Sequence, residues 1–340
     1  MAKKNETLEV ESIYPGVSLF KPGFPERWFR GVGLTDALCE NAGSLDILHA
    51  HMFWDHTVFA SWKASRRLHK PLVITPHGSV SENWRYKSLH KQIYRIFILE
   101  RVLRDTSAIH ALNKTEELAL RKFGYKGRID VIPNGVPEKL LETRISRQKA
   151  IQTWPQFKDK RVLLYLGRIW KGKGMDILIP AWKEVLKKAE NNGWHLVLAG
   201  PDYRGYGKKL KSQIVASGLE KNITMTGLVG GQEKESLMAL AEVFILPSHS
   251  EGFSMALLEA MAAGLPCVYT DRCNFPELAS AGGGILIKDE IVPLIDALTV
   301  VIKNSLGTNK SIGAKGRALG KRHYTHKVIG KKLLKLYHSL

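Results

Sequence analysis

Two glutamates, Glu251 and Glu259, stand eight positions apart around the start of an expected helix. An apolar run at 243–246 has strand character, and the helix is expected to begin near Ser254 and to end at Gly264. A strand, a glycine turn and a helix N-terminus present unpaired backbone N–H groups to an anion. Carboxylates beside those amides suit a ligand that carries hydroxyls as well as phosphate, such as a nucleotide sugar. The alternative is an ordinary strand–turn–helix unit with solvated glutamates.

The elements that must position these residues alternate regularly along the chain. Short apolar, β-branched strands alternate with helical segments, which is the pattern of a parallel sheet with helices on both faces. The expected strands are 46–49, 72–75, 107–112, 130–132, 162–166, 195–199, 223–226, 243–246 and 266–269. Because open α/β sheets bind ligands at the carboxyl ends of their strands, the chemistry should collect in the turns that follow them.

A length of 340 residues accommodates two domains. Residues 136–160 are polar, contain two prolines and lack strand character. We therefore expect a first domain at 1–140, a linker at 141–160 and a second domain at 161–320. A C-terminal helix at 321–340 is expected to pack back on the first domain.

The composition is that of a soluble globular protein, with 44% hydrophobic and 24% charged residues. No apolar run of the length of a membrane span occurs, and no apolar segment follows the charged N-terminus as in a signal peptide. Three cysteines without a Cys-x-x-Cys motif favour a reducing compartment and no structural zinc. The cytoplasm is the expected location.

The charge of the chain is strongly basic. Lys and Arg number 51 against 32 Asp and Glu, which leaves a net charge of +19. The last forty residues contain ten Lys or Arg and no Asp or Glu. Such an excess indicates an anionic partner, either a nucleic acid, a lipid surface or a phosphorylated substrate, and a merely solvated basic surface is the alternative. No nucleic-acid-binding motif is present, so a nucleic acid is not expected.

Several motifs, in one order, carry a family resemblance. Residues 46–51 read Asp-Ile-Leu-His-Ala-His, 75–78 read Thr-Pro-His-Gly, 130–136 read Asp-Val-Ile-Pro-Asn-Gly-Val, and 166–168 read Leu-Gly-Arg before a Lys-Gly pair at 173–174. Together with the Glu-x7-Glu spacing, the chain resembles the retaining glycosyltransferases of the GT-B fold, family 4 (group 1), over roughly residues 28–340. The resemblance implies an α/β fold with two Rossmann-like domains that face each other across a cleft.

The resemblance also implies roles for individual residues. Glu251 would contact donor-sugar hydroxyls, Glu259 would hold the ribose, and His77 would contact the transferred sugar. The other expected donor-binding positions, which bring backbone near the donor, are Gly227, Leu228, Gly252, Phe253, Ser254 and Met255. A lone histidine is more often structural than functional, so a structural role for His77 is the alternative.

Two cations are expected to stabilise the departing diphosphate. Arg168 and Lys173 lie five residues apart across a turn at the end of a strand, and both can contact the diphosphate with charge-assisted hydrogen bonds. The sequence contains neither Asp-x-Asp nor His-Glu-x-x-His, so no metal or other cofactor is expected. A surface ion pair is the alternative for Arg168. His49 and His51 share one face of a strand, where a structural role is favoured over a metal site.

The first domain departs from the family pattern. Its usual first strands are mostly missing before residue 46, although residues 12–20 could supply one strand. A glycine pair at 31–33 precedes a helix-like segment at 34–40 and could replace the usual glycine loop. The resemblance therefore supports the prediction of an acceptor site less strongly than the prediction of a donor site.

Two basic amphipathic segments could contact an anionic membrane surface. In 84–104 the residues Lys87, Lys91 and Arg95 share a helical face, and membrane contact is expected there. In 321–340 apolar and basic residues also lie on different sides, and packing against the first domain is favoured.

These observations predict a retaining, metal-independent glycosyltransferase that is cytoplasmic and peripheral on the inner face of the plasma membrane. It would move a sugar from a UDP or GDP donor to a lipid-linked or polysaccharide acceptor in cell-envelope glycan synthesis, including lipopolysaccharide. The main alternative is a truncated, non-catalytic protein that binds a nucleotide sugar. An epimerase or glycoside phosphorylase of the same fold is a further alternative.

Overall fold

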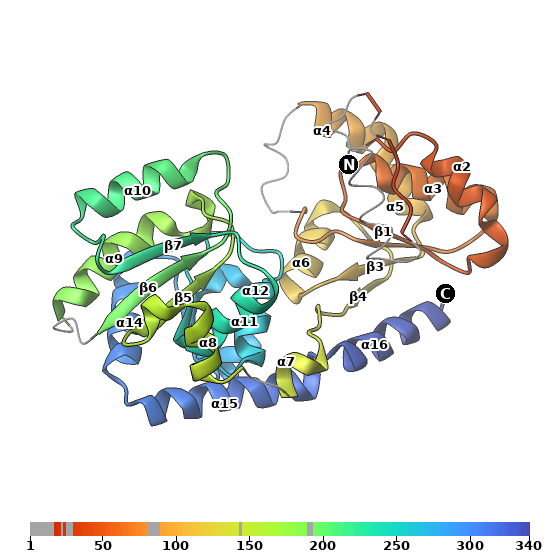
Figure 1. Ribbon diagram of the computed structural model, residues 1–340. Helices are drawn as coiled ribbons and strands as arrows, with labels where there is room; N and C mark the ends of the chain where they lie inside the picture. The colour runs from red at the N-terminus through yellow and green to blue at the C-terminus, as the bar shows by residue number, and fades with distance from the viewer. Residues whose placement is uncertain (1–16, 22, 25–29, 81–88, 143–144, 189–192) are drawn as a thin grey trace. The chain divides into compact units, whose positions relative to one another are not determined.

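The computed structural model describes residues 17–21, 23–24, 30–80, 89–142, 145–188 and 193–340 (Figure 1). The chain divides into two compact units. The first unit contains Met1–Pro133 together with Lys332–Leu340, and the second contains Asn134–Lys331. Each unit has a parallel sheet, helices and a hydrophobic core of its own, which confirms the expected α/β class with two domains.

The sheet of the first unit has four parallel strands in the order β1-β2-β3-β4. The strands are β1 (Leu48–His51), β2 (Leu72–Thr75), β3 (Ala108–Ala111) and β4 (Ile129–Val131). The helices of this unit are α2 (Leu34–Glu40), α3 (His56–Leu68), α4 (Leu89–Tyr94), α5 (Glu100–Asp105) and α6 (Lys114–Phe123). Every residue of β2 and β3 is buried, as expected for the central strands of a parallel sheet.

The sequence located these strands well but not completely. The expected strand 72–75 is confirmed, and those at 107–112 and 130–132 differ by one residue at each end. Strand β1 begins two residues later than expected, because Asp46 lies in a bend. Of the strand expected at 12–20, residues 12–16 lie outside the described residues and 17–20 form no strand.

The second unit has a six-stranded parallel sheet in the order β10-β9-β8-β5-β6-β7. Its strands are β5 (Arg161–Leu166), β6 (Trp194–Ala199), β7 (Ile223–Gly227), β8 (Ala241–Leu246), β9 (Cys267–Thr270) and β10 (Gly284–Ile287). Its helices are α7 (Glu138–Glu142), α8 (Arg147–Thr153), α9 (Met175–Lys188), α10 (Tyr206–Ala216), α11 (Gly231–Leu240), α12 (Met255–Ala262), α13 (Pro276–Ser280), α14 (Ile291–Lys303), α15 (Leu306–His323) and α16 (His326–His338), the last of which continues into the first unit. Strand β10 was missed because this short edge strand directly follows a run of glycines.

The strand order of the second unit reverses between β5 and β8. These two strands are neighbours in the sheet, although β6 and β7 lie between them in the chain. In doubly wound sheets the loops that leave two such strands diverge, and the ligand crevice opens between them at their carboxyl ends. The loops after Leu166 and after Leu246 are therefore where a ligand should bind.

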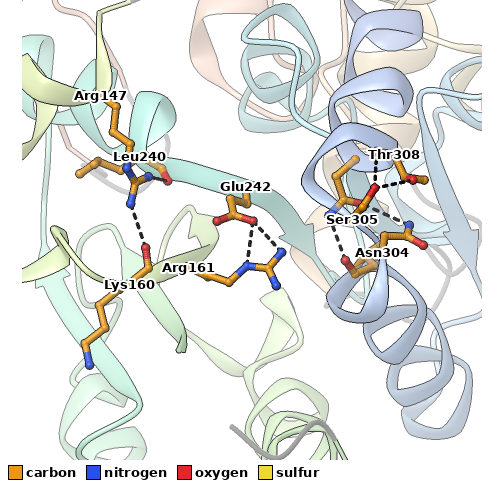
Figure 2. Close-up of polar contacts among 10 residues, drawn as sticks. Arg147, Lys160, Arg161, Leu240, Glu242, Asn304, Ser305 and Thr308 are labelled. Carbon is orange, nitrogen blue, oxygen red and sulfur yellow. Dashed lines mark hydrogen bonds and ion pairs between the residues drawn. The ribbon is translucent and has the colours of Figure 1, made fainter. Parts of the chain in front are cut away.

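The segment expected as a linker is folded into the second unit. Residues 141–160 include the end of α7 and all of α8. Figure 2 shows Arg147 of α8 donating to the carbonyl oxygens of Leu240 and Lys160, at 3.2 and 3.0 Å. The boundary between the units falls instead at Pro133 and Asn134, and at the other end only Lys332–Leu340 groups with the first unit. The polar composition of this segment reflects exposed short helices rather than a linker.

Helix α15 packs closely on α12 through glycines. Gly313, Gly316 and Gly320 are buried on one face of α15. A Cβ atom added at Gly313 would collide with the carbonyl oxygen of Gly264, the glycine in left-handed conformation that ends α12. The expected helix end at Gly264 is confirmed, and this close contact fixes the position of α12.

The basic helical face expected in 84–104 stays a prediction, because Lys87 and the side chain of Lys91 lie outside the described residues. A π-helical turn at Arg95–Leu99 separates α4 from α5. A π turn changes the angular register of the side chains that follow it. The Arg95 guanidinium lies over the Phe123 ring, 5.0 Å from its centre, with Nε 3.3 Å from Glu100. The exposed side chains of the described part of this segment include the apolar Ile93, Ile96 and Phe97 as well as Gln92, Glu100, Arg101 and Arg104.

Membrane-spanning potential is low in the part of the chain that the structure describes. No single helix there is long and apolar enough to cross a bilayer, and α14 and α15 meet the criterion only as a pair that is bent by 114°.

Candidate active site

The loops that leave β5 and β8 bring Lys173 and Glu251 together. Lys173 Nζ lies 2.6 Å from Glu251 Oε1, and the two side chains are 14% and 10% exposed. The residues are 78 positions apart in the chain. This ion pair lies at the reversal of strand order, where the sheet topology predicts a ligand.

Glycine 174 allows the two loops to approach. It has φ of +77°, and a Cβ atom at this position would collide with the carbonyl group of Pro247. The backbone N–H of His249 also donates to the carbonyl of Gly172 at 3.1 Å. A residue with a side chain at 174 would separate the loops and with them Lys173 and Glu251.

Glu251 is held by several further contacts. Ser248 Oγ donates to the same carboxylate oxygen as Lys173, at 2.7 Å. The backbone N–H of Glu251 donates to Arg272 O at 3.0 Å, and the carbonyl of Glu251 accepts from Asn274 Nδ2 at 2.7 Å. The position of this carboxylate is therefore set before any ligand binds.

Arg168 lies in the same loop as Lys173 but contacts different groups. Its guanidinium carbon lies 5.0 Å from the centre of the Tyr203 ring, in a cation–π contact. Its carbonyl accepts a hydrogen bond from the hydroxyl of the fully buried Tyr165, at 2.9 Å. Tyr203, in the loop after β6, was not identified from the sequence, since nothing in its local pattern indicates a contact with Arg168.

The N-terminus of α12 has the expected geometry. Ser254 is the N-cap residue, and its Oγ accepts a hydrogen bond from Leu257 N at 3.3 Å. The Phe253 ring packs against Phe275, with ring centres 5.5 Å apart, so its side chain is structural. Gly252 precedes these residues in the turn, and Met255, 40% exposed, is the first residue of the helix.

Glu259 forms a second, separate ion pair. Lys234 Nζ of α11 lies 2.9 Å from Glu259 Oε1, and the two side chains are 32% and 19% exposed. An apolar pocket adjoins this pair and is lined by Leu140, Ile145, Met238, Ala239 and Ala263, among others. Lys234 was missed because nothing in its local sequence distinguishes it from other surface lysines.

The last residue of β7 and the first residue after it are the two remaining expected positions. Gly227 has φ of +77°, and its carbonyl accepts from Gly200 N at 2.8 Å. A Cβ atom at Gly227 would meet nothing within 4 Å, so the left-handed backbone rather than a close approach explains this glycine. Leu228 beside it is 76% exposed, which leaves an apolar surface free at the strand end.

His249 lies between two carboxylates near Glu251. Its Nε2 is 2.8 Å from Asp176 of α9, and its Nδ1 is 2.6 Å from Asp289. A carboxylate only accepts hydrogen bonds, so both ring nitrogens carry protons when both contacts form. Burial lowers the pKa of His249, but the hydrogen bonds and charges of the two aspartates outweigh it and raise the pKa above its usual value.

In the first unit, His77 lies at the carboxyl end of β2 among other histidines. Its Nε2 is 2.8 Å from His51 Nδ1, and the ring of His51 stacks on that of His49 with centres 4.6 Å apart. His49 and His51 therefore share one face, as expected. Burial and the charges of His51, His110 and His77 lower the pKa of His49 to about 3, so this ring is neutral near pH 7.

A chain of hydrogen bonds fixes the tautomers behind this pair. His110 Nε2 is 2.6 Å from the carbonyl of Ile132, so that nitrogen donates and Nδ1 accepts from Thr75 at 2.9 Å. Thr75 has then used its one proton, and it accepts from His49 Nε2 at 2.7 Å. His49 Nδ1 in turn accepts from the Tyr337 hydroxyl at 2.6 Å. These neutral rings form a rigid base for His51.

The loop that contains His77 is also held through its backbone. His77 has φ of +53°, a left-handed conformation that is uncommon for a residue with a side chain. The buried carboxylate of Glu116 accepts from the next residue, Gly78 N, at 2.5 Å and from Leu112 N at 2.7 Å. Asn113 caps α6, with Oδ1 accepting from Glu116 N.

The described residues bring only some of the expected site residues into direct contact. Lys173 and Glu251 meet directly, and Arg168 lies in the same loop as Lys173. Glu259 pairs with Lys234 instead, and His77 belongs to the first unit. Within the described part of the chain, no group of three or more His, Cys, Asp or Glu side chains is arranged to hold a metal ion.

Comparisons with known proteins identify the family. The model of the glycosyl transferases group 1 matches residues 146–319, and that of Glycosyltransferase Family 4 matches residues 3–140. A GDP-mannose:cellobiosyl-diphosphopolyprenol alpha-mannosyltransferase of Xanthomonas oryzae pv. oryzae is 26% identical over 82% of this chain and 71% of its own length. A phosphatidyl-myo-inositol mannosyltransferase of Mycobacterium leprae is 27% identical over 88% of this chain and 74% of its own.

Solved structures show the same fold. Anabaena HepE in complex with UDP and glucose has a TM-score of 0.79 at 22% identity, with 98% of this chain and 89% of that chain covered. WaaG, a glycosyltransferase involved in lipopolysaccharide biosynthesis, has a TM-score of 0.64 at 18% identity, with 92% and 95% covered.

The two-unit fold and the family models define a GT-B glycosyltransferase. The chain belongs to the glycosyl transferases group 1, and it is a glycosyltransferase enzyme.

Proposed function

We infer that this enzyme transfers a sugar from a UDP or GDP donor to a lipid-linked or polysaccharide acceptor of the cell envelope, including lipopolysaccharide, with retention and without a metal. The names of its relatives support this choice, since one is a GDP-mannose:cellobiosyl-diphosphopolyprenol enzyme and another a phosphatidyl-myo-inositol mannosyltransferase. The structure of HepE holds UDP and glucose, which supports a UDP donor equally.

The observation that carries the proposal is the Lys173–Glu251 ion pair at the reversal of strand order. A carboxylate suits hydroxyl groups of the donor sugar, and the ammonium suits the diphosphate that leaves. Arg168 in the same loop would supply a second cation, and backbone N–H groups at the start of α12 would add hydrogen bonds. Two cations and a helix N-terminus together take the role that a metal has in other transferases.

The remaining expected residues receive supporting roles. Glu259, paired with Lys234, would bind the ribose, and the turn at Gly227 and Leu228 would lie near the base. His77 would contact the transferred sugar. The resemblance to the retaining glycosyltransferases of family 4 implies a reaction on the front face of the sugar, and we propose that the departing phosphate helps to take the acceptor proton.

Titration calorimetry of UDP, GDP and ADP into the full chain tests this proposal, with Arg168→Ala and Glu259→Ala as variants. We expect one uridine or guanosine nucleotide to bind and both variants to weaken it. A transfer assay with the matching labelled nucleotide sugar and a polyprenyl-diphosphate glycan then tests catalysis. Binding without transfer or donor hydrolysis would favour the non-catalytic alternative, and no binding at all would refute the donor site.

We also propose that the enzyme works in the cytoplasm, at the inner face of the plasma membrane. Ile96 and Phe97 expose 57% and 63% of their surface beside the basic residues Arg101 and Arg104. Exposed apolar side chains next to cations suit an anionic bilayer surface. Because Arg95 is engaged by Glu100 and Phe123, the apolar side chains rather than Arg95 would carry this contact.

A further inference from the structure

The ring of His77 has one hydrogen-bond partner within the described residues, and this partner is His51. His51 ends β1, and its register partner in β2 is Thr75, two residues before His77. The rings lie with centres 5.0 Å apart and the nitrogens 2.8 Å apart. The parallel pairing of β1 and β2 therefore places His51 beside the loop that contains His77.

His51 is itself held in place. Its ring stacks on His49 at an interplanar angle of 22°, and His49 is fixed on both nitrogens by Tyr337 and Thr75. An imidazole that is stacked on an immobile neighbour has little freedom to rotate, so its Nδ1 stays directed at His77. The backbone of the His77 loop is fixed independently, by Glu116 through Gly78.

The contact between two ring nitrogens restricts protonation. One nitrogen must carry the proton and the other must offer a lone pair, so the pair holds a single proton between Nδ1 of His51 and Nε2 of His77. When His77 is protonated, it still donates to a neutral His51. When both rings are neutral, the contact couples their tautomers, because His77 carries its proton on Nε2 when it donates to His51 and on Nδ1 when it accepts, and Nδ1 of His77 faces away from His51 in both cases.

We propose that His51 is a positioning residue, which orients the ring of His77 and selects its tautomer for contact with the transferred sugar. This inference rests on the proposed function in one respect, because it takes His77 to contact that sugar. It adds a residue to which neither the family resemblance nor the comparisons assign a role in the reaction.

The test compares His51→Leu with His51→Asn, because the asparagine amide places a polar atom close to the position of Nδ1. His338→Leu is the matched control, since it replaces an exposed histidine of the same unit that has no place in this group of side chains. Two measurements are made, the ring ¹⁵N signals of His77 by NMR, and the steady-state kinetics with the donor. Nucleotide affinity by calorimetry verifies that the second unit is unaffected.

We expect a single His77 tautomer in the wild type and an average of two in His51→Leu. The kcat of His51→Leu should fall about tenfold, the effect of one lost hydrogen bond, while nucleotide affinity stays within about twofold. His51→Asn should recover most of the kcat and the single tautomer, and His338→Leu should resemble the wild type in both measurements.

Unchanged His77 signals in His51→Leu would overturn the proposal. A fall in kcat that His51→Asn does not rescue would also overturn it, because packing alone would then explain the loss. If the wild type transfers no sugar from any donor, the proposed function fails, while the ring signals still decide whether His51 sets the tautomer. If His51→Leu does not fold, the His77 ring signals and the kcat of His51→Asn are compared with those of the wild type alone. An average of two His77 tautomers in His51→Asn would then contradict the proposal.

Discussion

At the scale of single residues, the ion pair of Lys173 and Glu251 is the central contact of the proposed donor site. Both side chains are mostly buried, and a buried charge without its partner is costly. Each group therefore stabilises the other before a ligand arrives. The ammonium of Lys173 has further donors for a diphosphate, and Ser248 keeps the carboxylate in place if the lysine shifts.

Replacing Lys173 with alanine should reduce kcat/KM about 100- to 1000-fold, because a charge that stabilises the leaving diphosphate is removed. Lys171→Ala is the matched control, since Lys171 lies in the same turn but is exposed, and we expect a change within about twofold. Steady-state transfer rates measure both. Equal losses in the two variants would show that loop charge in general, and not this ion pair, supports the reaction.

His249 should make the stability of the second unit depend on pH. Its pKa is raised in the folded state, so its contribution is fully present below the usual pKa of histidine and is lost as the pH rises through the raised value. The difference in unfolding free energy between wild type and His249→Gln should therefore be largest near pH 5.5 and should shrink toward pH 9. Urea unfolding at several pH values measures it, and a difference that grows with pH would contradict the two-aspartate contact.

At the scale of elements, the position of α12 depends on its contact with α15. Glycines on the inner face of α15 allow a close approach to the C-terminal end of α12, the helix that contains Glu259. A larger residue there would displace α12 relative to the sheet, and with it the proposed ribose contact.

Gly313→Ala should lower the free energy of unfolding by about 1–3 kcal/mol, because its Cβ would collide with the backbone of Gly264. Gly330→Ala is the matched control. Gly330 lies inside α16 with nothing within 4 Å of an added Cβ, so we expect a gain of about 0.5–1 kcal/mol from helix propensity. Chemical denaturation measures the free energy of unfolding of both variants. If Gly313→Ala destabilised the protein no more than Gly330→Ala does, α15 would have room to move away from Gly264.

The exposed apolar residues of the segment around the π turn should determine membrane binding. Ile96→Asp combined with Phe97→Asp should weaken co-flotation with phosphatidylglycerol vesicles at least about tenfold, because two apolar side chains no longer insert. Leu118→Asp is the control, since Leu118 is 60% exposed on α6 of the same unit. Vesicle binding that is equally weak for all three proteins, the wild type included, would refute the membrane proposal.

At the scale of the whole molecule, the chain consists of two units with separate hydrophobic cores, and the expected site residues are distributed over both. The residues expected to hold the nucleotide belong to the second unit. The group formed by His49, His51, His77 and His110 belongs to the first. A ligand that binds one folded unit stabilises that unit by mass action.

A nucleotide at about 100 times its dissociation constant should stabilise the second unit by about 2.7 kcal/mol. Hydrogen exchange should then slow about 100-fold in β5 and β8, while β2 of the first unit should be unaffected. Mass spectrometry of exchanged peptides measures this. Equal protection in β2 would mean that the nucleotide site is not confined to residues 134–331.

The sequence alone was enough to locate the local elements and the family motifs. Strand 72–75, the start of α2 after Gly33, the cap at Ser254 and the helix end at Gly264 all depend on neighbours within a few residues, so apolar runs, caps and glycines suffice to locate them. The two-domain α/β class followed from the alternation of such elements. Glu251, Glu259, Arg168 and Lys173 were identified by their motifs.

Only the tertiary structure decided which of these residues meet. The partners Lys173 and Glu251 are 78 positions apart, and Lys234 and Glu259 are 25 apart. Such pairs depend on strand order and on loop approaches at glycines such as Gly174, for which a single local pattern has no signal. The same reason explains why Tyr203, His249 and the partners of His77 were missed, and why the expected linker proved to be part of a packed unit.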